Sequence, residues 1–172
     1  MKISINKENL LKPLTSVVGI VEKRQTLPIL GNVFIRSVSN NLTIIGTDLE
    51  TEITTFVNKV ESEDGEITVA ARKLFDIVRS MPDAAVINLN AEQNNTVIVS
   101  SGRTRFTLQT LPAKDFPKLD VNNWDSEIKG SRSNLSDLLV ATQFAMAQQD
   151  VRYFLNGLLF EIEPGVLRTV AT

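Results

Sequence analysis

Residues 66–81, EITVAARKLFDIVRSM, contain a strand pattern that continues directly into a helix pattern. Residues 66–70 are rich in β-branched side chains, which favours a strand. Leu74, Phe75, Val78 and Met81 then recur at helical spacing and form one apolar face. We therefore expect a strand over 66–70 and a helix over 71–81.

The residues that follow this helix predict three more strands. Asn94 and Ser101-Gly102 fall at the expected turns, because Asn and Gly tolerate the positive φ of tight turns. The three strand-like runs cover 85–90, 95–100 and 103–109. The order strand, helix and three strands defines one β-α-β-β-β unit.

The same order precedes this unit. Residues 2–6 alternate as a short strand, and Asn6 is placed to cap a helix with its side-chain oxygen. Apolar residues then follow helical spacing from Leu10 to Val21, with Pro13 expected in the first turns or at a kink. Three strand-like runs follow, at 33–38, 41–46 and 49–58.

Two such units predict an α+β domain over residues 1–110. Neither helix could cover a sheet alone, so we expect both helices side by side on an antiparallel surface of about eight to ten strands. The prolines, aspartates and asparagines of residues 111–127 indicate an interdomain linker. Within it, Phe116 and Trp124 are expected to pack on a domain surface.

A larger repeat has an offset of 125 residues, which separates Asn9-Leu10 from Asn134-Leu135. It predicts a second domain from residue 128, with a strand, a helix and two strands, the first of these at 158–163. The helical stripe consists of Leu135, Leu138, Leu139, Thr142 and Met146. Nothing after these elements corresponds to 49–110, so we expect a fragment whose second domain is truncated, with an unpaired sheet edge.

Composition excludes several classes of function. The 172 residues include no cysteine and no histidine, which excludes disulfides, thiolate or imidazole zinc sites and histidine-dependent catalysis. A chain of this length buries roughly 70% of its unfolded surface. No apolar run approaches the ~20 residues of a membrane helix, and the start lacks the apolar core of a signal peptide. We expect a cytoplasmic protein.

The net charge of −2 does not by itself indicate a nucleic-acid partner, but the basic residues are segregated. Arg72, Lys73 and Arg79 share the polar face of the 71–81 helix with Asp76, and Lys12 lies opposite the first apolar stripe. Such faces suit contact with a polyanion. They also suit ordinary hydration, and both interpretations stay open.

Two further patterns have alternative interpretations. Asp48, Glu50 and Glu52 would share one strand face, either as a magnesium site of a nuclease or as a solvated strand. The alternating basic and apolar residues of 103–108 indicate either an amphipathic strand or an interface strand.

Several segments together resemble the bacterial DNA polymerase III β subunits, the β sliding clamps, and the likeness spans the whole chain. The final residues 167–172 stop just before the family motif would continue with Asp-Gly-His. The segments that carry the likeness include Thr26-Leu-Pro-Ile-Leu-Gly-Asn32, Gly46-Thr-Asp-Leu-Glu50, Ala71-Arg-Lys73, Gln149-Asp-Val-Arg-Tyr153 and Leu155-Asn-Gly157.

The resemblance implies a clamp fold of three similar domains and a head-to-tail homodimer ring with helices lining the hole. It implies a non-catalytic processivity factor that encircles duplex DNA and needs no cofactor or metal. The family's partners are the replicative polymerase alpha subunit, the clamp loader, and other polymerases and repair proteins, which bind through short hydrophobic peptides. A fragment of this length is expected not to close the ring.

The resemblance also implies roles for individual residues. Arg24 and Gln149 correspond to DNA contacts, and Tyr153 and Phe154 to a pair that stacks on single-stranded template. Weaker DNA candidates in the channel are Lys12, Arg72, Lys73 and Arg79. Part of the partner-peptide pocket corresponds to Arg152, Leu155 and Thr172. One half of the dimer interface corresponds to Lys73, Arg103, Arg105, Phe106 and Leu108. The alternatives are a carboxylate-metal nuclease and a protein-interaction scaffold without a DNA role.

Overall fold

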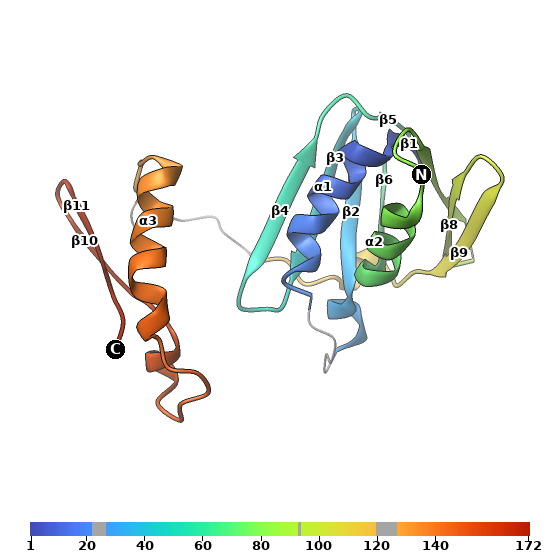
Figure 1. The fold of residues 1–172 in the computed structure, drawn as a ribbon. Coiled ribbons are helices and arrows are strands. Elements are labelled where there is room, and N and C mark those ends of the chain that lie inside the picture. The colour runs from blue at the N-terminus through green and yellow to red at the C-terminus, as the bar shows by residue number, and fades with distance from the viewer. Residues whose placement is uncertain (22–26, 93, 120–126) are drawn as a thin grey trace. The chain divides into compact units, whose positions relative to one another are not determined.

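The computed structural model describes residues 1–21, 27–92, 94–119 and 127–172, and the chain divides into two compact units, Met1–Asp120 and Val121–Thr172 (Figure 1). The described α-helices of the first unit are α1 (Lys7–Val18) and α2 (Ala71–Ser80), and short 3₁₀ helices cover Pro28–Gly31 and Ala113–Asp115. Its strands are β1 (Lys2–Asn6), β2 (Asn32–Val38), β3 (Asn41–Thr47), β4 (Glu52–Val57), β5 (Glu61–Ser62), β6 (Gly65–Ala70), β7 (Val86–Glu92), β8 (Thr96–Ser101) and β9 (Thr104–Gln109). The predicted order of elements is confirmed.

The expected antiparallel surface is divided into two sheets. Their strand orders are β5-β1-β7-β8-β9 and β4-β3-β2-β6. Each β-α-β-β-β unit therefore contributes its first strand to the sheet of the other unit. Asn6 of β1 lies opposite Val86 of β7, and Asn32 of β2 lies opposite Ala70 of β6. This exchange joins the two β-α-β-β-β units into one domain, because each sheet contains strands from both of them.

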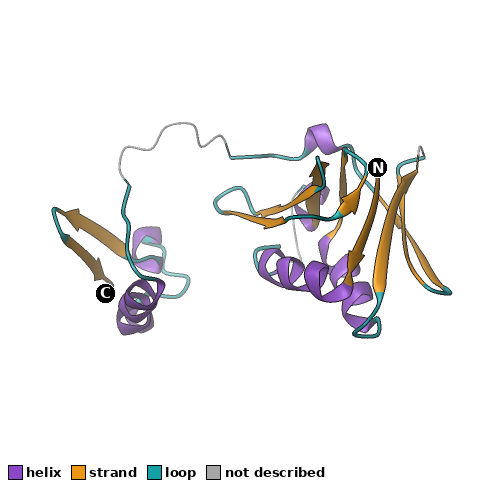
Figure 2. Cartoon of the chain, turned by 90° about the horizontal axis from the view of Figure 1, so that it is seen from above, coloured by secondary structure: helices purple, strands orange, loops and turns teal. Residues whose placement is uncertain are grey.

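The main core lies between the helices and the sheets. Figure 1 shows α1 and α2 side by side, and Figure 2 shows the two helices in one layer against the strands. Leu10, Leu14 and Val17 of α1 and Leu74 and Val78 of α2 are fully buried. Each buried side chain of this size contributes about 1.5–3 kcal/mol relative to an exposed one, so the two stripes stabilise the layer together.

The helix starts and ends differ in detail from the predictions. Asn6 occupies the N-cap position of α1, but its side chain accepts no capping hydrogen bond. Pro13 lies inside α1, past the first turn. The helix ends at Val18, although Val21 is still buried beyond it. Val21 fits the helical spacing because it is buried, although it is not part of the helix.

Strand β4 begins at Glu52, and the predicted strand start at Leu49 is wrong. The Asp48 carboxylate accepts the backbone N–H groups of Glu50 (3.0 Å) and Thr51 (2.7 Å), which closes a turn. Leu49 has a φ of 80° in this turn. Asp side chains favour such local turns over an extended ladder.

Residues after β9 pack on the outer face of the four-stranded sheet. Phe116 is buried against the ring of Phe34 with centroids 5.5 Å apart, alongside Ile29 and Ile45. The predicted packing of Phe116 is confirmed, whereas Trp124 lies outside the described residues. The short strand β5 was not predicted, since two residues give no periodicity.

The second unit contains α3 (Arg132–Thr142), β10 (Leu159–Glu163) and β11 (Val166–Val170). Ser131 caps α3 by accepting the N–H of Asn134 at 3.2 Å. The expected strand before this helix is wrong for residues 127–131, which are irregular. The corresponding strand of the first unit pairs with β7, and the described residues of the second unit contain no counterpart of β7.

No helix within the described ranges has both the length and the apolarity needed to cross a membrane.

Candidate nucleic-acid and partner interfaces

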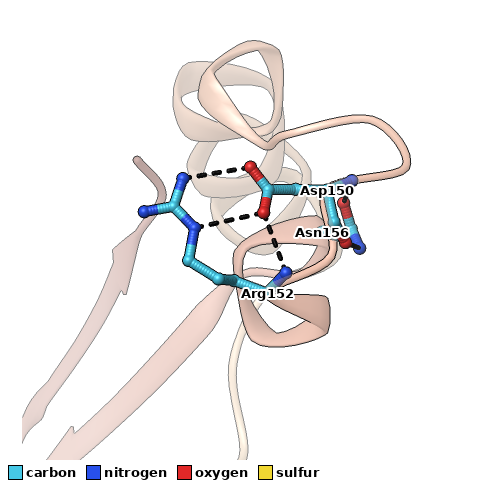
Figure 3. A network of polar contacts seen from close by, with 3 residues as sticks. All are labelled: Asp150, Arg152 and Asn156. Atoms are coloured by element: carbon cyan, nitrogen blue, oxygen red, sulfur yellow. Dashed lines mark hydrogen bonds and ion pairs between the residues drawn. The ribbon is translucent and has the colours of Figure 1, made fainter.

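The loop between α3 and β10 is held by a network of polar contacts among Asp150, Arg152 and Asn156 (Figure 3). The Asp150 carboxylate accepts the backbone N–H of Arg152 at 2.8 Å. Both carboxylate oxygens also pair with the Arg152 guanidinium, at 3.1 Å from Nε and 3.0 Å from Nη2. Arg152 keeps the pKa of Asp150 below its usual value, and Asp150 raises the pKa of Arg152.

Asn156 closes the same loop from the other end. Its Oδ1 accepts the N–H of Asp150 at 3.0 Å, and its Nδ2 donates to the Asp150 carbonyl at 3.1 Å. Two backbone hydrogen bonds also close the loop. The N–H of Leu155 donates to the carbonyl of Arg152 at 2.9 Å, and the N–H of Ala147 donates to the carbonyl of Leu155 at 3.0 Å. These bonds fix a compact turn in a segment with few buried side chains.

The predicted stacking pair lies on this turn and is open to solvent. The side chains of Tyr153 and Phe154 are 83% and 66% exposed, and their rings meet edge to face with centroids 6.0 Å apart. Gln149, with a φ of 59°, is exposed immediately before Asp150. Exposed aromatic faces of this kind can take unpaired bases by stacking.

The predicted pocket residues are only partly gathered. Arg152 and Leu155 share the turn, and Leu155 is half-buried. Thr172 is exposed beyond the end of β11. Their role in binding a peptide stays a prediction.

The four weaker DNA candidates of the first unit lie on α1 and α2, but they differ in whether they contact other parts of the protein. Lys12 and Lys73 are exposed, on α1 and α2. Arg72 donates from Nη2 to the carbonyl of Val21 at 2.7 Å, which ties the start of α2 to the segment after α1. Arg79 pairs with Asp76 at 3.1 Å. Lys12 and Lys73 are therefore the better-placed residues for a mobile contact, and Arg24 lies outside the described residues.

Strand β9 is an edge of the five-stranded sheet, paired with β8 on one side. Leu108 packs against the core, whereas Phe106 is 37% exposed at the edge. Arg105 faces Glu92 at 4.0 Å, and Arg103 lies in the turn before β9. No other described strand pairs with β9, and an edge with both apolar and basic side chains suits pairing with a further strand. The assignment to a dimer interface stays a prediction.

The magnesium-site interpretation of Asp48, Glu50 and Glu52 loses its geometric basis. Asp48 lies in the turn before β4, and the Glu52 carboxylate accepts the N–H of Leu119 (3.0 Å) and the hydroxyl of Thr54 (3.1 Å). Across the part of the chain that the structure describes, no group of three or more Asp or Glu residues is arranged to hold a metal ion.

Sequence reasoning missed two functional or structural contacts. One is the pair of hydrogen bonds between the Asn156 side chain and the backbone of Asp150, which we call the Asn156 clasp. In the sequence, an amide and a carboxylate across a short loop are only a weak sign of such a contact. The other is buried Lys7, which contacts Asp83. A lysine directly after an apolar strand was its one sequence signal.

Comparison with known proteins now decides the family. Residues 1–120 match the family model for the DNA polymerase III beta subunit, N-terminal domain. The chain belongs to this family. The beta sliding clamp of Pseudomonas aeruginosa is 48% identical over 176 residues, and that of Escherichia coli K12 is 49% identical over 175 residues. Each alignment covers 100% of this chain and 47% of the relative.

Solved structures of DNA polymerase III beta subunits have the same fold. The Pseudomonas aeruginosa structure has a TM-score of 0.94 at 48% identity, covering 100% of this chain and 47% of that chain. The Caulobacter crescentus structure has a TM-score of 0.92 at 36% identity, with the same coverage. The chain thus spans about half the length of the beta-subunit relatives it matches, and the expected clamp fold is confirmed.

Proposed function

We propose that this chain is part of a β sliding clamp, the non-catalytic processivity factor of a bacterial replicative polymerase. The observation that carries the proposal is the match to beta sliding clamps over all 172 residues, at 48–49% identity and with a TM-score of 0.94. The clamp would encircle duplex DNA and slide, in the bacterial cytoplasm. Topological retention needs no base-specific contact, so sparse and exposed basic residues are sufficient.

The helix layer is the proposed DNA side. Lys12 and Lys73 are exposed there, and no hydrogen bond or ion pair to another described residue would have to break for them to reach phosphates. Their charge would act through counterion release, which is independent of DNA sequence. Arg24 and Gln149 are proposed as further DNA contacts on the ring face, and Tyr153 and Phe154 as a platform for unpaired template bases.

The free edge of β9 is the proposed dimer interface. Phe106 and Arg105 would meet a strand of the partner subunit, which would extend the five-stranded sheet across the interface and remove its open edge. We infer that ring closure also needs the part of the relatives that this chain does not match.

The turn that holds Arg152 and Leu155 is proposed as part of a pocket for short hydrophobic peptides. The replicative polymerase alpha subunit, the clamp loader and repair proteins would bind there in turn. No observation on the described residues favours a nuclease, because the Asp48 carboxylate closes a turn and the Glu52 carboxylate accepts hydrogen bonds from Thr54 and Leu119.

A chimera tests the proposed function. Residues 1–172 of this chain would replace the matching part of the Pseudomonas aeruginosa clamp, and processive DNA synthesis would be measured with the loader and polymerase of that organism. We expect long products and retention on circular but not on linearised DNA. The matched control carries Phe106→Asp, which should weaken the ring and shorten the products. A chimera that folds and dimerises yet gives no processive synthesis would refute the proposal.

A further inference from the structure

The exposed aromatic pair has little of its own packing to hold it in place. Tyr153 and Phe154 contact each other edge to face, and both are mostly exposed. Val151, between Asp150 and Arg152, is 96% exposed. The orientation of the pair is therefore set by the backbone of residues 150–156 rather than by burial.

The Asn156 side chain makes two of the hydrogen bonds that close this backbone. Asn156 both accepts the N–H of Asp150 and donates to its carbonyl, so the side-chain amide imitates the pairing of two backbone strands across the turn (Figure 3). The carboxylate of Asp150 accepts the N–H of Arg152 and pairs with its guanidinium. The two sets of bonds meet at Asp150, whose backbone groups bond Asn156 and whose carboxylate bonds Arg152.

We propose that Asn156 is a positioning residue, whose amide clasp on Asp150 holds Tyr153 and Phe154 ready to stack on unpaired bases. This inference rests on the proposed DNA-binding function. Binding is strengthened when the bound conformation exists beforehand, because the ordering cost is not met at the moment of binding.

The chemistry of the clasp explains why asparagine is needed. The contact uses one donor and one acceptor at the end of a short side chain, which the Asn amide supplies. Asn156→Asp keeps the shape but replaces the donor with an acceptor, so a carboxylate oxygen would face the Asp150 carbonyl. Asn156→Ala removes both the donor and the acceptor of the side chain.

The experiment uses the 172-residue chain with Asn156→Asp and Asn156→Ala. The matched control is Asn134→Ala, an exposed asparagine of α3 whose backbone N–H, and not its side chain, takes the Ser131 cap. Amide hydrogen exchange without DNA reports the turn at Asp150, Arg152 and Leu155. Fluorescence anisotropy of a labelled oligothymidylate at low salt reports base stacking.

We expect both Asn156 variants to lose exchange protection at these three amides and to bind the oligothymidylate about tenfold more weakly, the effect of about one lost stacking contact. The far-ultraviolet circular dichroism and the control should be unchanged. In a chain that already carries Tyr153→Ala and Phe154→Ala, the Asn156→Ala change should weaken binding no further, because it acts through the aromatic pair.

Different failures are distinguishable. Unchanged exchange in the Asn156 variants, or additive effects with the aromatic substitutions, would overturn the positioning role. Lost protection with unchanged binding would overturn it while leaving the proposed function intact, provided that the aromatic substitutions themselves weaken binding. If the unmodified chain does not bind oligothymidylate, the DNA contact of the proposed function fails and the positioning role fails with it.

Discussion

Lys7 is a buried cation that joins two segments far apart in the sequence. Its ammonium donates to the Met81 carbonyl at 2.5 Å and to the fully exposed Asp83 carboxylate at 3.0 Å. Lys7→Met keeps the stem but leaves the Met81 carbonyl without this donor. We expect the free energy of unfolding to fall by about 1–3 kcal/mol, measured by urea denaturation.

The control for this change is Lys2→Met, because Lys2 is exposed and pairs with exposed Glu63 at 3.3 Å. Exposed pairs contribute about 0–1 kcal/mol. Equal losses in the free energy of unfolding for Lys7→Met and Lys2→Met would mean that the burial of Lys7 does not add to stability.

Gly65 combines a φ of 153° with a close neighbour. Gly65 is the first residue of β6, and a Cβ placed there would lie 2.8 Å from the Cβ of Met1. Gly65→Ala should therefore cost about 1–3 kcal/mol by thermal or urea unfolding. Gly31→Ala is the comparison, since, apart from its chain neighbours, no atom of the described residues lies within 4 Å of the position that its methyl group would take. A neutral Gly65→Ala would show that β6 can shift without loss.

The ion pair of Asp150 and Arg152 predicts a pH dependence of the turn. The folded pKa of Asp150 is lowered, so its contribution is present above the unfolded value and is lost as the pH falls through the folded value. Exchange protection of the Arg152 amide, corrected for intrinsic rates, should be constant above about pH 5 and fall only below about pH 4. Loss of protection near pH 6 would contradict this assignment.

At the scale of elements, periodic segments were predictable and local side-chain turns were not. The stripes of α1 and α2 report burial directly, so their helices follow from spacing. The start of β4 does not follow from spacing, because over residues 48–51 hydrogen bonds to the Asp48 carboxylate form a turn in place of the hydrogen bonds of a strand. The clasp of Asn156 was missed for the same reason, since its partners are backbone groups that the sequence does not mark.

Thr68 connects the segment after β9 to strand β6. Its buried hydroxyl accepts from Asn32 (3.1 Å) and from the Leu111 N–H (3.1 Å), and donates to the Leu111 carbonyl (2.7 Å). Thr68→Val leaves these groups unpaired at constant volume, which should cost about 1–3 kcal/mol. We also expect faster tryptic cleavage after Lys114 and Lys118. Thr107→Val on exposed β9 is the control, and equal cleavage rates would contradict the link.

At the scale of the whole molecule, the repeat predicted the order of elements but not their pairing. Both β-α-β-β-β units have the same apolar periodicity, which specifies which face of a strand is buried. It does not specify that β1 pairs with β7 and β6 with β2, because that exchange depends on contacts between residues far apart in the chain. The resemblance to clamps, unlike periodicity, identified the fold as well.

The distribution of charge over the first unit gives the last prediction. The chain carries a net charge of −2, yet Lys12 and Lys73 are exposed on the helix layer, while Lys2 lies on a strand of the five-stranded sheet. If the helix layer meets DNA, the logarithm of duplex affinity falls linearly with the logarithm of salt concentration, with a slope of about −0.9 per phosphate contact. Lys12→Ala and Lys73→Ala should each reduce that slope by up to about one contact, measured by anisotropy of a labelled duplex. Lys2→Ala removes the same charge and should leave the slope unchanged. An equal effect of all three would mean that net charge, and not the helix layer, governs binding.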